Sequence, residues 1–109
     1  MIVRVYVAGP MRIGFERGVH EAVRAADELV GEGFIPFVPQ TTLWNMLSPK
    51  DDTYGYFLPI DCAWIDVCDA LLRLPGESWG SDQEVAYAEK IGKPVFYSIS
   101  QLRKWKESR

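Results

Sequence analysis

Short apolar runs alternate with segments of helical periodicity along the chain, and this alternation constrains the fold more than any other feature. The first run, IVRVYVA at 2–8, is rich in β-branched residues, as expected of a strand that is covered on both faces. Apolar residues then recur at helical spacing from Phe15 to Val30, until Gly31 and Gly33 end the pattern. The N-terminal part of the chain therefore predicts a strand followed by an amphipathic helix.

The same alternation continues to the C-terminal end. Further strands are expected at 34–38, 69–74 and 94–98, and further helices at 56–68, 82–91 and 99–108. Pro36 predicts that the second strand lies at a sheet edge or a bulge, since proline cannot donate to the ladder. Strands separated by helices form a parallel sheet with right-handed crossovers. We predict one α/β domain over residues 1–109, a flavodoxin- or Rossmann-like three-layer sandwich with a parallel sheet of four to five strands.

Composition narrows the classes of function. The 109 residues carry a formal net charge of −3, so no basic field attracts nucleic acid and we expect no nucleic-acid partner. No apolar run approaches the roughly 20 residues of a membrane span, and no secretory signal is present, so we expect a cytoplasmic protein without a membrane partner. The spacing of Cys62 and Cys68 matches neither a zinc knuckle nor a redox pair, and we expect no metal or other cofactor.

In open α/β sheets ligands bind at the carboxyl ends of the strands, so the segments that follow strands are the candidates for a site. Three such segments are AGPMRIG at 8–14, the helix start around Asp61, and LPGESWGSDQE at 74–84. The first lacks the Lys-Ser/Thr of a Walker A loop, and GxGxxG is absent. What remains is a small-residue turn near Arg12, whose backbone N–H groups suit a sugar or an anion.

Two carboxylates in these segments each have a structural alternative to a catalytic role. The four residues from Ser81 to Glu84 fit a capping box, in which Ser81 caps the helix and Glu84 reaches back to its backbone N–H. Asp61 shares the apolar stripe of its helix with Ile65, which turns this acid toward the protein. A half-buried acid needs a partner or a purpose, and helix capping or a salt bridge to Arg73 would supply the partner.

One connection, PQTTLWNMLSPKDDTYGY at 39–56, is far longer than is usual in such a domain. Long loops in compact domains are often lids or binding loops. This one carries Trp44, Tyr54 and Tyr56, whose flat rings are suited to stacking on a nucleobase. Covering the core or a subunit interface is the alternative for each of these rings.

Taken together, the motifs resemble a known superfamily. YVAGPMR at 6–12, the spacing Asp61-x2-Trp64-x4-Asp69, and LPGESWGSDQEVAYAEKIGKPV at 74–95 are similar to the nucleoside 2-deoxyribosyltransferase superfamily. The layout is most similar to that of the 2'-deoxynucleoside 5'-monophosphate N-glycosidases. The resemblance runs from Val5 to Tyr97, and it identifies the chain as a single nucleoside 2-deoxyribosyltransferase-like domain.

The resemblance implies three catalytic residues. Glu84 matches the nucleophile that attacks the anomeric carbon of the sugar. Asp61 matches the acid that protonates or hydrogen-bonds the leaving base, and Tyr6 matches a tyrosine beside the nucleophile. The chemistry is consistent, because a carboxylate stabilises the oxocarbenium-like charge of such a reaction and a proton on the base improves the leaving group.

The resemblance also implies the substrate contacts. Gly9, Met11 and Arg12 match the loop that contacts sugar and phosphate. Ser78 stands where transferases that act on free nucleosides carry an acid, and a hydroxyl at a helix N-terminus can donate to a phosphate that a carboxylate would repel. We therefore expect a nucleoside 5'-monophosphate as substrate, with Gly80 among the binding residues and Trp44 against the base.

The same family completes its site with a residue of a neighbouring subunit, and we expect a homodimer or a larger homo-oligomer. Because the chain ends soon after its fourth expected strand, we expect hydrolysis rather than transfer to a second base. Two alternatives stay open beside the N-glycosidase and the 2-deoxyribosyltransferase. PGESWGS followed by Glu84 is similar to the PGGxGTxxE loop of phosphoribohydrolases that release cytokinin bases, with one extra residue. A nucleotide-binding or sensing module without catalysis is the other.

Overall fold

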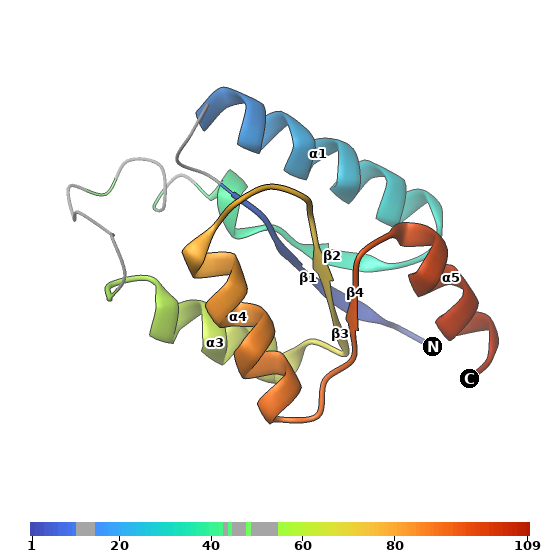
Figure 1. Cartoon of the computed structure of the whole chain (residues 1–109). Coiled ribbons are helices and arrows are strands. Elements are labelled where there is room, and N and C mark those ends of the chain that lie inside the picture. Colours follow the sequence, from blue (N-terminus) through green and yellow to red (C-terminus); the bar gives the residue numbers. More distant parts are fainter. Residues whose placement is uncertain (11–14, 43, 45–47, 49–54) are drawn as a thin grey trace.

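The computed structural model describes residues 1–10, 15–42, 44, 48 and 55–109 (Figure 1). Its elements are β1 (Arg4–Ala8), α1 (Phe15–Gly31), β2 (Ile35–Phe37), a 3-10 turn η1 (Pro39–Thr41), α3 (Leu58–Val67), β3 (Ala70–Arg73), α4 (Trp79–Lys90), β4 (Val95–Phe96) and α5 (Ile99–Glu107). All strand pairs are parallel, in the order β2-β1-β3-β4. The predicted α/β sandwich with a parallel sheet of four to five strands is confirmed, with four strands in the described residues.

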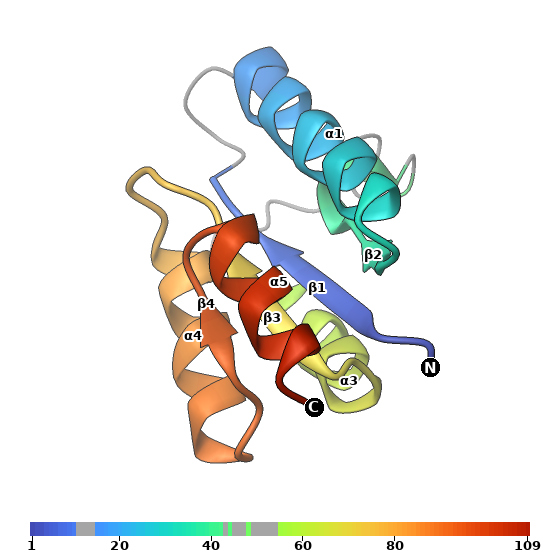
Figure 2. The same ribbon diagram turned by 90° about the vertical axis from the view of Figure 1, so that its right-hand side faces the viewer.

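Helices cover both faces of the sheet, with α1 and α5 on one face and α3 and α4 on the other (Figures 1 and 2). The alternation of β1 divides its side chains between two core clusters. The cluster under α1 and α5 is made of Val3, Val5, Val7, Ala25, Leu29, Phe34, Ala70, Leu72 and Leu102. The cluster under α3 and α4 is made of Tyr6, Ala8, Ile65, Cys68, Leu71 and Ala88. The two faces therefore differ in composition from the start of the first strand.

The prediction from Pro36 is confirmed, because β2 lies at an edge of the sheet and pairs with β1 only. Ile35 donates its N–H to the Val3 carbonyl at 2.9 Å, which places this part of β2 against β1. Gly33 has a φ of +88°, a conformation that glycine adopts without steric cost, and this explains why the helix pattern ends there. Both cysteines are free thiols. In the part of the chain that the structure describes, no helix is long and apolar enough to cross a membrane.

The start of α4 differs from the sequence prediction. The helix begins at Trp79, and its N-cap is Ser78, whose hydroxyl accepts the Ser81 N–H at 3.1 Å. The capping box predicted from Ser81 to Glu84 is therefore wrong, because Ser81 already lies inside the first turn. Glu84 is one turn further along the helix and has no capping role. The Glu84 side chain is therefore available for contacts outside the helix cap.

Candidate active site

A hydrogen bond between Tyr6 and Glu84 lies at the centre of the candidate site. The Tyr6 hydroxyl donates to Glu84 Oε2 over 2.8 Å. Tyr6 comes from β1 and is fully buried, whereas Glu84 comes from α4 and is 7% exposed. The even-numbered residues of β1 face the α3 and α4 layer, so the strand's alternation turns Tyr6 toward Glu84. A buried carboxyl is costly unless it is hydrogen-bonded, and Tyr6 supplies that bond.

Asp61 adds a second carboxyl group to this pair. It lies in the first turn of α3, one turn before the buried Ile65, and is half-buried. Burial, the charge of Asp61 and a hydrogen bond with Asp61 raise the pKa of Glu84 to about 9. The Glu84 carboxyl therefore keeps its proton at neutral pH.

The protonation of Tyr6 follows from the same surroundings. Burial, and then the charges of Glu84 and Asp61, raise the pKa of the Tyr6 hydroxyl. Tyr6 therefore stays protonated and acts as a hydrogen-bond donor. Arg73, the salt-bridge partner considered for Asp61, forms an ion pair of 3.1 Å with Asp82.

Two of the three candidate loops are pressed together next to this cluster. A Cβ atom at Gly9 would lie 3.1 Å from Leu74, and one at Gly76 would lie 2.8 Å from Pro10. Gly76 also has a φ of +114°, which strains any residue with a side chain. The glycines thus permit close contact between the segments that follow β1 and β3. The carboxyl-end rule correctly predicted that these segments meet.

Gln40 is a candidate that the sequence analysis missed. It follows β2, is 2% exposed, and its Nε2 donates to the Gly9 carbonyl at 3.4 Å. Its Oε1 is buried and has no hydrogen-bond partner among the residues that the structure describes. Buried acceptors without a partner are rare in folded proteins, and a catalytic role or a bound water or ion are among the explanations for them. The signal was available, since Gln40 stands just past the carboxyl end of a strand.

The predicted binding residues Ser78 and Gly80 lie at the start of α4. The Ser78 hydroxyl is engaged in the cap, where it accepts the Ser81 N–H and lies 2.9 Å from Ser81 Oγ. A Cβ atom at Gly80 would meet nothing within 4 Å, so this part of the first turn is sterically open. The N-terminal end of α4, which carries Ser78 and Gly80, is the positive end of the helix dipole. It lies near the cluster of Tyr6, Glu84 and Asp61.

Trp44 belongs to an aromatic group at the beginning of α3. Its ring packs edge-on against Tyr56 and Phe57 at centroid distances of 6.1 and 5.0 Å, and it is 51% exposed. A second aromatic group leads from the site to the surface, because Phe37 stacks on Tyr6 at 5.8 Å and on Trp64 at 4.8 Å. The predicted contacts Met11, Arg12 and Tyr54 lie outside the described residues.

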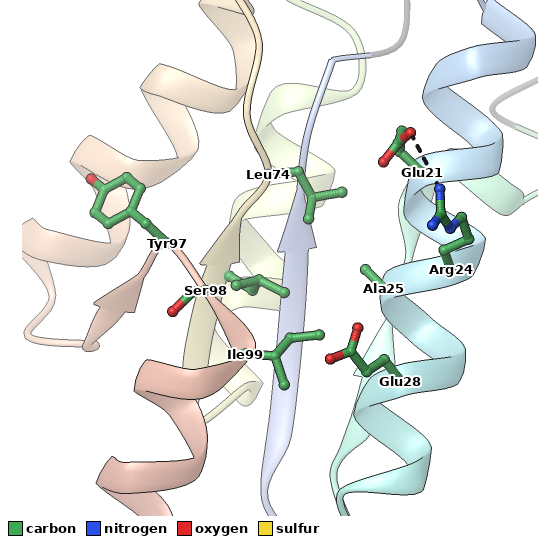
Figure 3. A pocket seen from close by; sticks show the side chains of 9 residues that line it. Glu21, Arg24, Ala25, Glu28, Leu74, Tyr97, Ser98 and Ile99 are labelled. Atoms are coloured by element: carbon green, nitrogen blue, oxygen red, sulfur yellow. Dashed lines mark ion pairs between the residues drawn. The ribbon is translucent and has the colours of Figure 1, made fainter.

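A groove of about 270 Å³ lies elsewhere, between α1 and the beginning of α5 (Figure 3). The residues that line it include Arg24, Glu28, Leu72, Leu74 and Tyr97. Leu72 belongs to the cluster under α1 and α5, so this groove opens on the face of the sheet opposite to Glu84. The candidate site and the groove are thus separate features.

The family of the chain follows from a sequence model. The model of a domain of unknown function, DUF4406, matches residues 3–97. The chain belongs to the DUF4406 family. A search of curated protein sequences gives no match.

Solved structures share the fold of this DUF4406 chain. A 2-deoxyribosyltransferase from Bacillus psychrosaccharolyticus aligns with a TM-score of 0.65 and 21% identity, over 85% of this chain and 69% of that one. A conserved protein from Enterococcus faecalis V583 gives 0.66 and 17%, over 87% and 62%. A 2-deoxyribosyltransferase from Leishmania mexicana gives 0.59 and 20%, over 85% and 61%. The DUF4406 chain spans about three fifths of the length of the last two structures. The resemblance to 2-deoxyribosyltransferases is confirmed at the level of the fold.

Proposed function

We propose that this DUF4406 domain is an N-glycosidase that hydrolyses the bond between base and sugar in a nucleoside or deoxynucleoside 5'-monophosphate. The observation that carries the proposal is the cluster of the buried Glu84 and Tyr6 with the half-buried Asp61. Burying ionisable groups that do not stabilise the fold is characteristic of sites that perform chemistry. The fold neighbours named 2-deoxyribosyltransferases support the same class of bond.

The two carboxyl groups divide the reaction between them. An oxygen of Glu84 bonds to the anomeric carbon as the bond to the base breaks, while the proton of Asp61 passes to the departing base nitrogen. Water then attacks the anomeric carbon of the ester, Glu84 leaves as a carboxylate, and a water proton returns to Asp61. The cycle begins and ends with one proton on the pair. The raised pKa of Glu84 keeps this proton in the cluster at neutral pH, and its transfer from Glu84 to Asp61 precedes the attack on the sugar.

Tyr6 has a supporting role in the proposed reaction. Its hydroxyl donates to Glu84 Oε2, so it orients the carboxylate and favours the ionised form that attacks the sugar. Gln40 adds a buried acceptor, Oε1, beside Gly9 for a donor group of the substrate. Both residues act by hydrogen bonding, which favours one orientation of the nucleotide.

The phosphate is assigned to the beginning of α4 and to Arg12. Ser78 already uses its hydroxyl in the helix cap, so the N-terminal end of the helix, open at Gly80, makes the larger contribution on that side. A carboxylate at position 78 would repel a phosphate, and serine removes that repulsion. These contacts favour a 5'-monophosphate over a free nucleoside.

Transfer of the sugar to a second base is the second candidate. It is favoured by the names of the two fold neighbours from Bacillus psychrosaccharolyticus and Leishmania mexicana. The first chemical step is the same in both reactions. They differ only in whether water or a base attacks the sugar bound to Glu84.

A panel of nucleosides and 5'-monophosphates tests both candidates. The released base is measured by chromatography, with and without a second free base. Hydrolysis predicts base release from monophosphates without an acceptor, and transfer predicts a new nucleoside or nucleotide that requires the acceptor. Monophosphate binding without cleavage in either condition contradicts both and leaves a sensing module.

Assembly is a further expectation of this proposal. Trp44, Trp64 and Trp79 are each about half exposed, and a chain of this size gains by burying such rings at an interface. Trp105 instead packs on Phe96 of its own chain at a centroid distance of 5.3 Å. Light scattering is expected to find a homodimer or larger oligomer at tens of micromolar, and a monomer there would contradict the expectation.

A further inference from the structure

Arg73 is a buried cation that the proposed reaction does not use. It is the last residue of β3 and is 9% exposed. Its Nη1 donates to the Leu74 carbonyl, and its Nη2 donates to the Gly76 carbonyl at 2.9 Å and to Asp82 at 3.1 Å. One guanidinium thus ties together the end of β3, the loop that follows it and the first turns of α4.

The sheet places Arg73 on the same face as Glu84. Leu72 packs under α1 and α5, while Leu71 packs under α3 and α4, so the alternation of β3 turns Arg73 toward the α4 layer. Arg73 pairs in register with Ala8, two residues beyond Tyr6 on β1. The guanidinium therefore stands at the same carboxyl end of the sheet as the Tyr6–Glu84 hydrogen bond.

We propose that Arg73 is a positioning residue for Glu84: it fixes the loop at 74–78 against α4 and places a buried positive charge beside the reacting carboxylate. The inference rests on the proposed function of Glu84. The planar fork of arginine can serve two carbonyls and a carboxylate at once, whereas lysine provides only a point charge. The partner Asp82 is 68% exposed, so solvent screens its charge and leaves much of the charge of Arg73 uncompensated.

The groups around Glu84 act in opposite directions on its ionisation. Tyr6 from β1 and Arg73 from β3 lower the pKa of Glu84, while Asp61 from α3 raises it. Cys62, also from α3, is a neighbouring thiol whose own pKa is raised to about 11, so it stays uncharged. Among the described residues that act on the Glu84 carboxyl, Arg73 is thus the cation. Its removal favours the protonated form of Glu84.

Two substitutions distinguish this role from a purely structural tie. Arg73→Met removes the ion pair of 3.1 Å and the hydrogen bonds to the Leu74 and Gly76 carbonyls, whereas Asp82→Asn removes only the ion pair. A structural tie therefore predicts shifts in the same direction, larger in Arg73→Met. The proposal predicts that only Arg73→Met moves the Glu84 titration to higher pH, because Arg73→Met removes the positive charge and Asp82→Asn leaves it less compensated. Arg73→Lys is the conservative variant that keeps the charge without the fork.

The test is a titration of the Glu84 carboxyl by carbon NMR in the ligand-free full chain. We expect the Glu84 titration to move to higher pH in Arg73→Met, to stay close to the parent in Arg73→Lys, and to move to lower pH or stay in Asp82→Asn. Where nucleotide cleavage is measurable, Arg73→Met should also lower kcat by on the order of 10²-fold with a smaller change in KM. The acidic limb of the pH–activity profile of Arg73→Met should move to higher pH.

Each outcome decides between the two roles. An unchanged Glu84 titration in Arg73→Met, or an upward shift in both Arg73→Met and Asp82→Asn, overturns the proposal. If Arg73→Met does not fold, an upward shift in Asp82→Asn or a displaced titration in Arg73→Lys overturns it instead. The titration needs no turnover, so a parent protein that cleaves no nucleotide contradicts the proposed function without deciding the charge effect of Arg73.

Discussion

The two faces of the sheet bury different kinds of side chain. The face under α1 and α5 buries only apolar side chains in its core cluster, among them Leu29, Phe34 and Leu102. The face under α3 and α4 buries Tyr6 in a smaller cluster, with the ionisable Glu84 and Arg73 beside it. Burying ionisable groups is costly, and the apolar packing of the other face offsets that cost. Stability and proposed chemistry are therefore separated by one layer of strands.

The largest effect is expected when the carboxylate of the α4 face is removed. Glu84→Gln keeps the side-chain shape and an acceptor for Tyr6, but cannot attack the sugar. We expect turnover to fall about a thousandfold or more, about 4 kcal/mol of barrier. At about pH 4, where the carboxyl is protonated in the folded state, the free energy of unfolding should change by less than about 1 kcal/mol. Glu89→Gln, on an exposed position of the same helix, is the matched control. Parental activity in Glu84→Gln would contradict the proposal that the carboxylate on the α4 face performs the reaction.

Truncation on the apolar face should have the opposite signature. Leu29 is fully buried in α1, and Leu29→Ala is expected to lower the free energy of unfolding by about 3 kcal/mol through lost burial and a cavity. Denaturant unfolding measures this loss. The pH profile of cleavage in the folded fraction should stay in place, since Leu29 packs on the other side of the sheet. A shifted profile would show that the faces are coupled.

Removal of the Tyr6 hydroxyl tests a single contact within the α4 face. Tyr6→Phe deletes the donor to Glu84 Oε2 and should cost about 1–2 kcal/mol of stability. Because that hydrogen bond lowers the pKa of Glu84, its loss should move the acidic limb of the activity profile to higher pH. Tyr97→Phe changes an exposed ring and serves as the control. An unmoved limb in Tyr6→Phe would argue against the orienting role of this hydroxyl.

A further prediction concerns the dependence of stability on pH. A carboxyl with a raised folded pKa binds its proton more tightly in the folded state, so it stabilises the fold at low pH. That contribution is lost as pH rises from the usual value near 4.5 to about 9. Glu84→Gln should therefore flatten the decline in stability over this window, as measured by urea unfolding at several pH values. Parallel curves for parent and variant would mean that burial does not perturb this carboxyl.

Sequence periodicity could predict the sheet and the division of its faces, because Val5, Tyr6 and Val7 alternate and parallel strands bring their carboxyl ends together. It could not fix the start of α4. Ser78 and Ser81 are both good caps three residues apart, and the choice depends on packing rather than on local sequence. The place of Gln40 after β2 could have marked it as a candidate, but its contact with the distant carbonyl of Gly9 could not be predicted.

The central claim is that Glu84 forms a bond to the sugar. The most direct measurement is peptide mass mapping after the protein is mixed with a cleavable 5'-monophosphate and quenched in acid within one turnover. The account predicts a sugar phosphate attached to the peptide that contains Glu84, and to the same peptide in the Glu89→Gln control. Base release with no sugar on that peptide, or with sugar on a different residue, would contradict it.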